Sequence, residues 1–109
     1  MPSRLFEALR ALAHPARMEF LIWLGDPQTH FGLTESEARD GVSAGRFEKG
    51  GLSQSTVSAH LAILQRAGFL TAQRCGQKVL YRRNERFVAW FKKALGDRLK
   101  AGGMDIGRL

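Results

Sequence analysis

The segment from Gly51 to Leu70, GLSQSTVSAHLAILQRAGFL, constrains the fold of this chain more than any other. Ser53 is the expected N-cap of a helix that Gly68 ends. Its aliphatic residues repeat at i, i+4 and i+7, the spacing of one buried face: Val57, Leu61 and Leu64. Small and hydroxyl-bearing residues fall on the outer side: Ser55, Ser58, Ala59 and Ala62. The hydroxyls form either a catalytic cluster or a surface that meets a partner rich in donors and acceptors.

A basic β-hairpin is predicted directly after this helix. In FLTAQRCGQKVLYRR, β-forming residues flank a short turn centred on Gly76, and the arms carry four cations: Arg74, Lys78, Arg82 and Arg83. The net charge of +7 is unevenly placed, because residues 1–59 hold six Lys and Arg against seven Asp and Glu, whereas residues 60–109 hold eleven against three. This asymmetry indicates a polyanionic partner for the second half, either nucleic acid or a membrane surface.

Helices are expected on both sides of this unit. Ser3 is the predicted N-cap of a helix to about Ala13, and Pro15 begins a second helix, to Leu24, that is apolar almost all round and is therefore expected in the middle of the core. The last helix runs from Glu85 to about Ala101, and its apolar residues cover about half the circumference. This exceeds the needs of a small core, so a second chain is the expected cover.

The segment of residues 25–41 is the least regular part. GDPQTHFG predicts a loop, Thr34 and Glu37 form a capping box that predicts a short helical turn, and GVSAGRFEKGG predicts a short helix of about two turns. The acidic residues and the histidine of this segment are compatible with a ligand-sensing insertion. A longer surface loop explains them equally well.

The chain is expected to form one domain, residues 1–101, followed by a flexible tail, residues 102–109. No apolar run approaches the ~20 residues of a spanning helix, and the N-terminus lacks the features of a signal peptide, so no membrane partner is expected. Cys75 is the single cysteine, which excludes an intrachain disulfide and predicts the reducing cytoplasm as the compartment.

Helices, a short helix-turn-helix, a basic hairpin and a closing helix make a winged helix-turn-helix: a mainly α fold of five to six helices with a two-stranded wing. The chain resembles the ArsR family of bacterial and archaeal transcriptional repressors. The similarity rests on ALAHPARMEFLIWL, close to that family's Ala-Leu-Ala-Asp-Pro-x-Arg opening, and on LSQSTVSAHLAILQRAGFL followed by GQKVLYRRN. It covers residues 8–24 and 51–84, and the end helices match in character only.

A recognition helix brings short donors and acceptors to base edges in the major groove of double-stranded DNA. The candidates for base contacts are Gln54, Ser55 and Ser58, and those for phosphate contacts or structural roles are Ser53, Thr56 and His60. In the wing, the candidates for backbone or minor-groove contacts are Arg74, Gln77, Lys78 and Arg82. A solvated Ser-rich helix start and a solvated charged hairpin are the structural alternatives. Family members commonly carry Arg or Lys at the position of Ala59, so we expect modest specificity per half-site.

The resemblance implies a homodimeric repressor that binds a pseudo-palindromic operator. The helices near Arg4 to Ala13 and Glu85 to Ala101 are expected to form the dimer interface through Leu5, Phe6, Leu9, Phe87, Trp90, Phe91 and Leu95. Relief of repression would need an inducer, an unknown small molecule that binds the DNA-free form better. The main alternative is a winged helix that docks an acidic protein partner. An RNA- or single-strand-binding role has only Tyr81 as an exposed aromatic candidate.

Other chemistry finds little support in the sequence. Thiolate metal sites need several sulfurs, and His14, His30 and His60 lack ligand spacing, so neither a metal nor a cofactor is expected. Cys75, near Arg74 and Lys78, is either a redox-sensitive residue or an incidental surface cysteine. Ser58 and His60 are two residues apart and point away from each other on a helix, so an enzyme is not expected.

Overall fold

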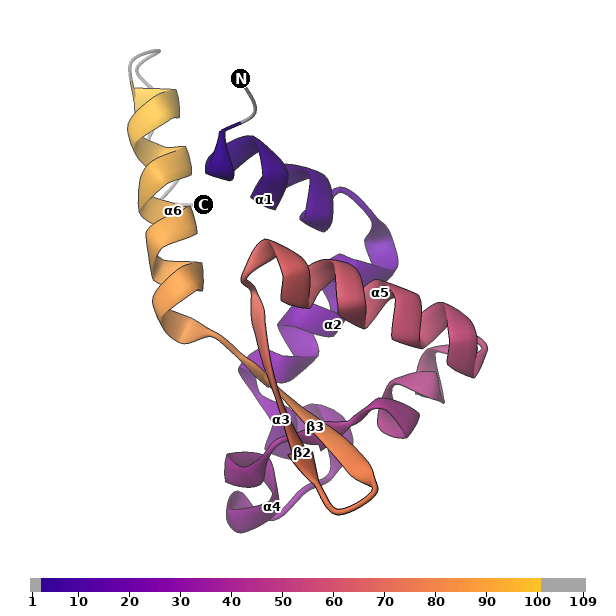
Figure 1. Ribbon diagram of the computed structural model, residues 1–109. Coiled ribbons are helices and arrows are strands. Elements are labelled where there is room, and N and C mark those ends of the chain that lie inside the picture. The colour runs from indigo at the N-terminus through magenta and orange to yellow at the C-terminus, as the bar shows by residue number, and fades with distance from the viewer. Residues whose placement is uncertain (1–2, 101–109) are drawn as a thin grey trace.

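The computed structural model describes residues 3–100, so the predicted tail of residues 102–109 lies outside the described residues. The elements are α1 (Arg4–Leu12), α2 (Pro15–Gly25), α3 (Pro27–Phe31), α4 (Glu35–Asp40), β1 (Val42–Ser43), the 3₁₀ helix η1 (Ala44–Gly50), α5 (Gln54–Ala67), β2 (Leu70–Cys75), β3 (Lys78–Arg83) and α6 (Glu85–Lys100). Helices α1 and α2 and the 3₁₀ helix η1 pack on α5, the hairpin β2–β3 runs from the end of α5 past α3 and α4, and α6 stands beside α1 (Figure 1). The predicted class, a mainly helical winged helix-turn-helix, is confirmed.

Polar side chains begin the main helices where the sequence predicts. Ser3 Oγ accepts a hydrogen bond from the Phe6 amide at 3.2 Å, and Ser53 Oγ accepts one from the Thr56 amide at 3.3 Å. His14 Nδ1 accepts from the Ala16 amide at 3.1 Å directly before α2. These contacts satisfy backbone donors that lack a partner in the first turn of a helix.

The predicted loop in residues 25–32 is wrong, because α3 forms there. Asp26 Oδ1 accepts from the Thr29 amide at 3.4 Å, and Pro27 occupies the first turn, so this short sequence carries its own start signal. Phe31 is buried, with its ring centroid 5.0 Å from that of Phe47, which fixes the short helix to the core. The helical turn that follows is confirmed, and its capping box joins Thr34 and Glu37 by reciprocal bonds of 3.1 and 2.9 Å.

The predicted two-stranded wing is a three-stranded antiparallel sheet in the order β1-β3-β2. Val42 pairs with Tyr81 and Ser43 with Leu80. The short helix predicted for residues 41–51 therefore begins only after these two paired residues, as the 3₁₀ helix η1. Gly41 precedes the strand at φ 117°, where an added Cβ would lie 3.0 Å from Leu80 Cβ. Two paired residues are too few to show an alternating pattern, which explains why the sequence did not indicate β1.

The core forms between α5, α2, η1 and the base of the sheet. Leu61 and Leu64 of α5 are fully buried, as are Phe20 and Phe47. The prediction that α2 lies in the middle of the core is wrong in part, because Met18 and Ile22 are 42% and 47% exposed. In a chain of this size one face of α2 meets α5 and α3, and no further layer covers the opposite face in residues 3–100.

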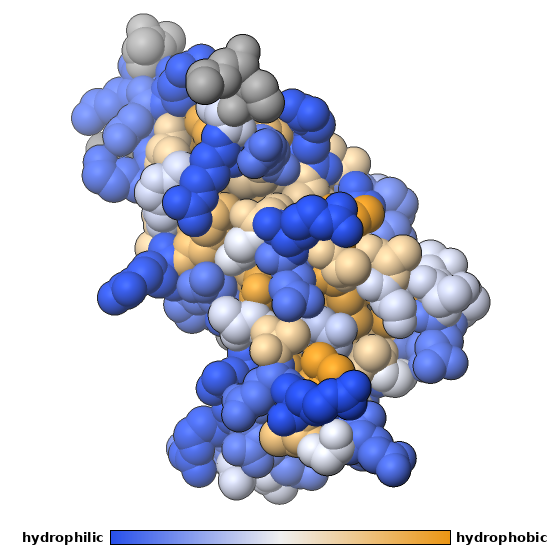
Figure 2. Space-filling view, viewed as in Figure 1, coloured by the Kyte–Doolittle hydropathy of each residue, from blue (hydrophilic) through white to orange (hydrophobic). Residues whose placement is uncertain are grey.

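Helix α6 divides its aromatic residues between the interior and the surface. Phe87 and Phe91 pack on Phe69, with ring centroids 4.9 and 5.2 Å apart. Leu5, Phe87 and Phe91 are buried in this chain's own core, so their assignment to the surface of a dimer interface is wrong. The outward residues near the α1–α6 contact are Phe6, Trp90 and Leu99, which are 47%, 37% and 36% exposed. Figure 2 shows apolar surface where α1 and α6 lie, whereas the region of α4 and the hairpin is mainly hydrophilic.

Candidate nucleic-acid interface

The outer face of α5 is built from small polar side chains over a buried aliphatic face. Gln54, Ser55 and Ser58 are exposed, whereas Val57 and Leu61 on the inner side are almost fully buried. Within residues 3–100, the side chains of Gln54 and Ser58 have no hydrogen-bond partner, and α5 contains no acidic residue. Their donors and acceptors therefore point to solvent from a rigid helix, as a contact with base edges requires.

Ser53 and Thr56 are linked to each other at the start of this helix. Besides accepting from the Thr56 amide, Ser53 Oγ donates to Thr56 Oγ1 at 2.9 Å and lies 3.3 Å from Ser55 Oγ. The hydroxyls thus cap the helix and order one another. Both residues remain exposed, so a phosphate contact is compatible with their position.

His60 is buried on the inner side of α5, which contradicts a phosphate contact and leaves the other predicted alternative, a structural role. It lies three residues after Val57 and four before Leu64, and is only 9% exposed. Arg17 Nη1 donates to His60 Nδ1 at 3.1 Å, and the His14 ring centroid lies 4.4 Å away. Burial, followed by the charges of His14 and Arg17, holds the pKa of His60 below its ordinary value. Ser58 is exposed on the other side of the helix, so the two do not form a nucleophile–base pair.

Three of the four predicted wing contacts lie together at the hairpin tip. Arg74, Gln77 and Lys78 are exposed there, and the register pairs Arg74 with Val79 and Cys75 with Lys78. Because neighbouring positions of a strand point to opposite faces, Arg74 and Lys78 place their cations on the two sides of the wing. Cys75 is exposed at the same tip.

Arg82 and Arg83 belong to the base of the wing. Arg82 lies four residues along β3 from Lys78, or ~13 Å at ~3.3 Å per residue, and its Nη1 donates to the Arg39 carbonyl at 3.3 Å. Arg83 makes two hydrogen bonds to Glu85, of 2.8 and 2.7 Å, and these lower the pKa of that carboxyl. The structure therefore separates Arg82 from the tip cluster.

Two cationic side chains with structural or surface positions were not assigned from the sequence. Arg17 connects α2 to α5 through His60 and also donates through Nε to the Ala11 carbonyl at 2.5 Å. Arg46 is exposed on η1, the helix that precedes α5. The AHPAR motif drew attention to the region of Arg17. No pattern in the sequence indicated a role for Arg46, because residues 41–51 were interpreted only as a short helix.

Residues 3–100 contain neither a metal-binding cluster nor a membrane-spanning helix. No three His, Cys, Asp or Glu side chains of these residues are grouped closely enough to hold a metal ion. No helix in the same range combines the length and hydrophobicity needed to cross a membrane.

Comparison with known proteins places this arrangement in a family. Residues 48–72, which end η1 and include all of α5, match the model of the bacterial regulatory protein family arsR. The chain is 35% identical over 85 residues to the HTH-type transcriptional regulator YbzH of Bacillus subtilis, covering 75% of this chain and 85% of the relative. The chain belongs to the ArsR family. It is therefore a DNA-binding transcription regulator, and the resemblance seen in the sequence is confirmed.

Solved structures agree with this assignment. The ArsR-like regulator of Rhodococcus sp. RHA1 shares the fold, with a TM-score of 0.67 over 91% of this chain and 81% of that chain at 23% identity. HlyU of Vibrio cholerae is 25% identical, with a TM-score of 0.59 over 84% and 87%. The transcriptional repressor BigR of Xylella fastidiosa is 26% identical, with a TM-score of 0.55 over 82% and 79%.

Proposed function

We propose that this ArsR-family regulator is a homodimeric repressor that binds a specific, pseudo-palindromic DNA sequence and acts by binding, not by catalysis. The observation that carries the proposal is the exposed polar face of α5 beside the basic tip of the wing. Gln54, Ser55 and Ser58 would read base edges in the major groove. Arg74, Gln77 and Lys78 would contact the backbone or the adjacent minor groove, with Ser53 and Thr56 at neighbouring phosphates.

A dimer would form through the apolar surface of α1 and α6. Phe6, Trp90 and Leu99 are exposed there, and the half-buried Leu9 and Leu95 adjoin them. Two-fold symmetry would present two copies of α5 to half-sites spaced by about one helical turn or a multiple. Repression would follow when the dimer occupies promoter DNA, and the name of the BigR neighbour, a transcriptional repressor, supports this direction of regulation.

The decisive experiment is selection of bound duplexes from random DNA by the complete chain. We expect an inverted repeat, which Gln54→Ala and Ser58→Ala lose or relax. Ser36→Ala, an exposed hydroxyl on α4, is the matched control and should recover the same sequence as the unaltered chain. Recovery of unrelated sequences by the unaltered chain would contradict sequence-specific binding.

An acidic protein partner that the basic second half would also suit is the second candidate for what the polar face of α5 and the wing contact with specificity. Salt distinguishes the two. For DNA, log affinity should fall linearly with log salt, with a slope of about −0.9 per phosphate contact. A weak salt dependence without any sequence preference would favour the protein partner.

A further inference from the structure

Arg17 joins three helices on the inner side of α5. Its Nε donates to the Ala11 carbonyl of α1 at 2.5 Å, and its Nη1 donates to His60 Nδ1 of α5 at 3.1 Å. Ala11 belongs to the last turn of α1, whose carbonyls have no partner further along the helix, so the guanidinium satisfies one of them. One half-buried side chain of α2 therefore connects α1, a helix of the proposed dimer interface, with α5, the helix proposed to enter the major groove.

The hydrogen bond between Arg17 and His60 requires that His60 Nδ1 carries no proton. A guanidinium has donors and no acceptor, so Nδ1 must accept, and the single proton of the neutral ring lies on Nε2. A second proton on the ring goes to Nδ1 and turns that atom into a donor. Protonation thus replaces a hydrogen bond by repulsion between two donors that are both positively charged.

The immediate surroundings of His60 do not favour this proton. The ring is 9% exposed, and its centroid lies 4.4 Å from that of His14 and 6.0 Å from that of Phe20. Burial first, then the charges of His14 and Arg17, lower the pKa of His60. Within residues 3–100, no ion pair of 4.0 Å or less involves His60 or Arg17.

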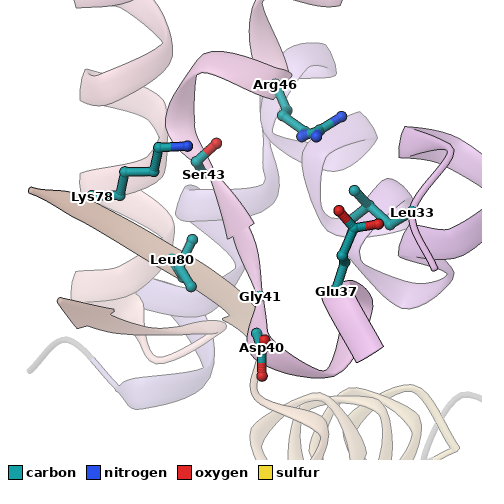
Figure 3. A pocket seen from close by; sticks show the side chains of 8 residues that line it. All are labelled: Leu33, Glu37, Asp40, Gly41, Ser43, Arg46, Lys78 and Leu80. Carbon is teal, nitrogen blue, oxygen red and sulfur yellow. The ribbon is translucent and has the colours of Figure 1, made fainter. Parts of the chain in front are cut away.

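Other charged residues of the elements packed on α5 do not act on the pKa of His60. These elements are α1, α2, η1 and β2. Their carboxylates are Glu7, Glu19 and Glu48, and their remaining cations are Arg4, Arg10, Arg46, Lys49 and Arg74. Arg46 lines a hollow of about 250 Å³ between α4, η1 and the wing, where the Glu37 carboxylate faces it (Figure 3). Among residues 3–100, the charges that act on His60 are therefore those of Arg17 and His14.

We propose that the hydrogen bond between Arg17 and His60 is a proton-sensitive clamp that holds α5 in its DNA-binding orientation, and that a proton on His60 Nδ1 opens the clamp and lowers the affinity for DNA. The inference rests on the proposed use of α5. The repulsion from Arg17 is relieved when α5 shifts away from α2, and a helix held in the major groove cannot make this shift. The free chain therefore accepts the proton more readily than the DNA complex, so acid favours release of the DNA.

The first measurement follows the ¹⁵N-labelled, DNA-free chain by NMR from pH 7.5 to pH 5.0, with far-UV circular dichroism on the same samples. We expect amides along the whole of α5 to shift with the midpoint of the His60 ring while the helical signal is kept. They include Gln54, six residues or ~9 Å along the helix from His60. If the distant amides do not follow the ring, or if the helical signal is lost with the same midpoint, a local clamp is overturned.

The second measurement is the affinity for the duplex that selection recovers at pH 7.5, by fluorescence anisotropy at constant ionic strength. We expect the dissociation constant to rise as pH falls below 6.5, toward a limit of about tenfold per pH unit for one proton. His60→Gln keeps an acceptor for Arg17 and takes no proton, so it should bind normally at pH 7.5 and lose the acid response. His14→Ser keeps the N-cap of α2 and should retain the response.

Arg17→Met should imitate acid, with a dissociation constant about tenfold higher at pH 7.5 and little further change on acidification. Arg10→Met is its matched control, because it removes the same charge from an exposed position on α1 and should retain the acid response. The proposal is overturned if His60→Gln retains the response, or if the two arginine variants behave alike. The arginine pair decides the matter if His60→Gln does not fold. Selection that recovers no sequence contradicts the proposed function, whereas the DNA-free titration still decides whether the clamp exists.

Discussion

Helices α5 and α6 are both amphipathic, yet they use their faces in opposite ways. Helix α5 buries its aliphatic residues and shows small polar groups to solvent. Helix α6 buries Phe87 and Phe91 but leaves Trp90 and Leu99 on the surface. The packing of α5 is complete within one chain, whereas α6 retains apolar surface that a second chain would cover. The buried aliphatic face of α5 therefore stabilises the fold, whereas the exposed apolar residues of α6 would hold two chains together.

Matched Leu→Ala changes in the two helices should give the largest effect. Leu61 of α5 is fully buried, so Leu61→Ala should lower the free energy of unfolding by about 2–5 kcal/mol, through lost burial and the cavity left behind. Leu99→Ala in α6 should change it by less than about 1 kcal/mol at concentrations where the chain is monomeric, because this side chain is 36% exposed. Urea unfolding measures both. Similar losses would mean that α6 packs as completely as α5.

Trp90→Ala should affect association more than folding. Its ring is 37% exposed and lies next to the Phe87 ring, with the Arg4 guanidinium 5.0 Å from its centroid. A large aromatic residue in an interface contributes about 2 kcal/mol or more, so we expect the dimer dissociation constant to rise about 30-fold. Sedimentation equilibrium measures this constant. Phe91→Ala, one residue further but buried, is the contrasting variant and should destabilise the fold itself.

The sequence predicted α5 well because several signals agree there. The cap at Ser53, the aliphatic spacing and the ending at Gly68 define the same helix, and the structure has it at Gln54–Ala67. The phosphate contact proposed as one role of His60 was wrong because the chemistry of the side chain was weighed above its position, on the same face as Val57 and Leu64. For a polar residue on an apolar face, the spacing was the better guide.

The dimer surface and β1 were harder to predict for a different reason. Apolar residues of α6 show which side is apolar, but only the folded chain decides that Phe87 meets Phe69 while Trp90 stays outside. Strand β1 exists because Gly41 lets the chain approach Leu80, a contact between residues distant in sequence. Local patterns carry no information about such pairings.

Acidic pH should lower the stability of the fold through His60, which packs between the inner side of α5 and α2. The cationic form of His60 is disfavoured by burial, by His14 and by Arg17, so the folded chain binds this proton less readily than the unfolded chain. The free energy of unfolding should therefore fall as pH drops below 6.5, by at most ~1.4 kcal/mol per pH unit for this group. Unfolding at several pH values, with an NMR titration of the ring, measures it. His60→Gln should flatten the dependence between pH 7 and the range where carboxyl groups titrate, and an unchanged dependence would contradict the role of His60.

Ala59→Arg tests the outer side of α5 and should have the smallest effect. Ala59 is exposed beside Ser58, so a long cation fits there without disturbing the buried face. If this face meets DNA, the new guanidinium should neutralise about one more phosphate and steepen the plot of log affinity against log salt by about 0.9. The free energy of unfolding should stay within about 0.5 kcal/mol of the unaltered chain. If Ser36→Arg on α4 steepens the plot of log affinity against log salt by the same amount, any added surface charge has this effect, and α5 makes no specific contact with the duplex.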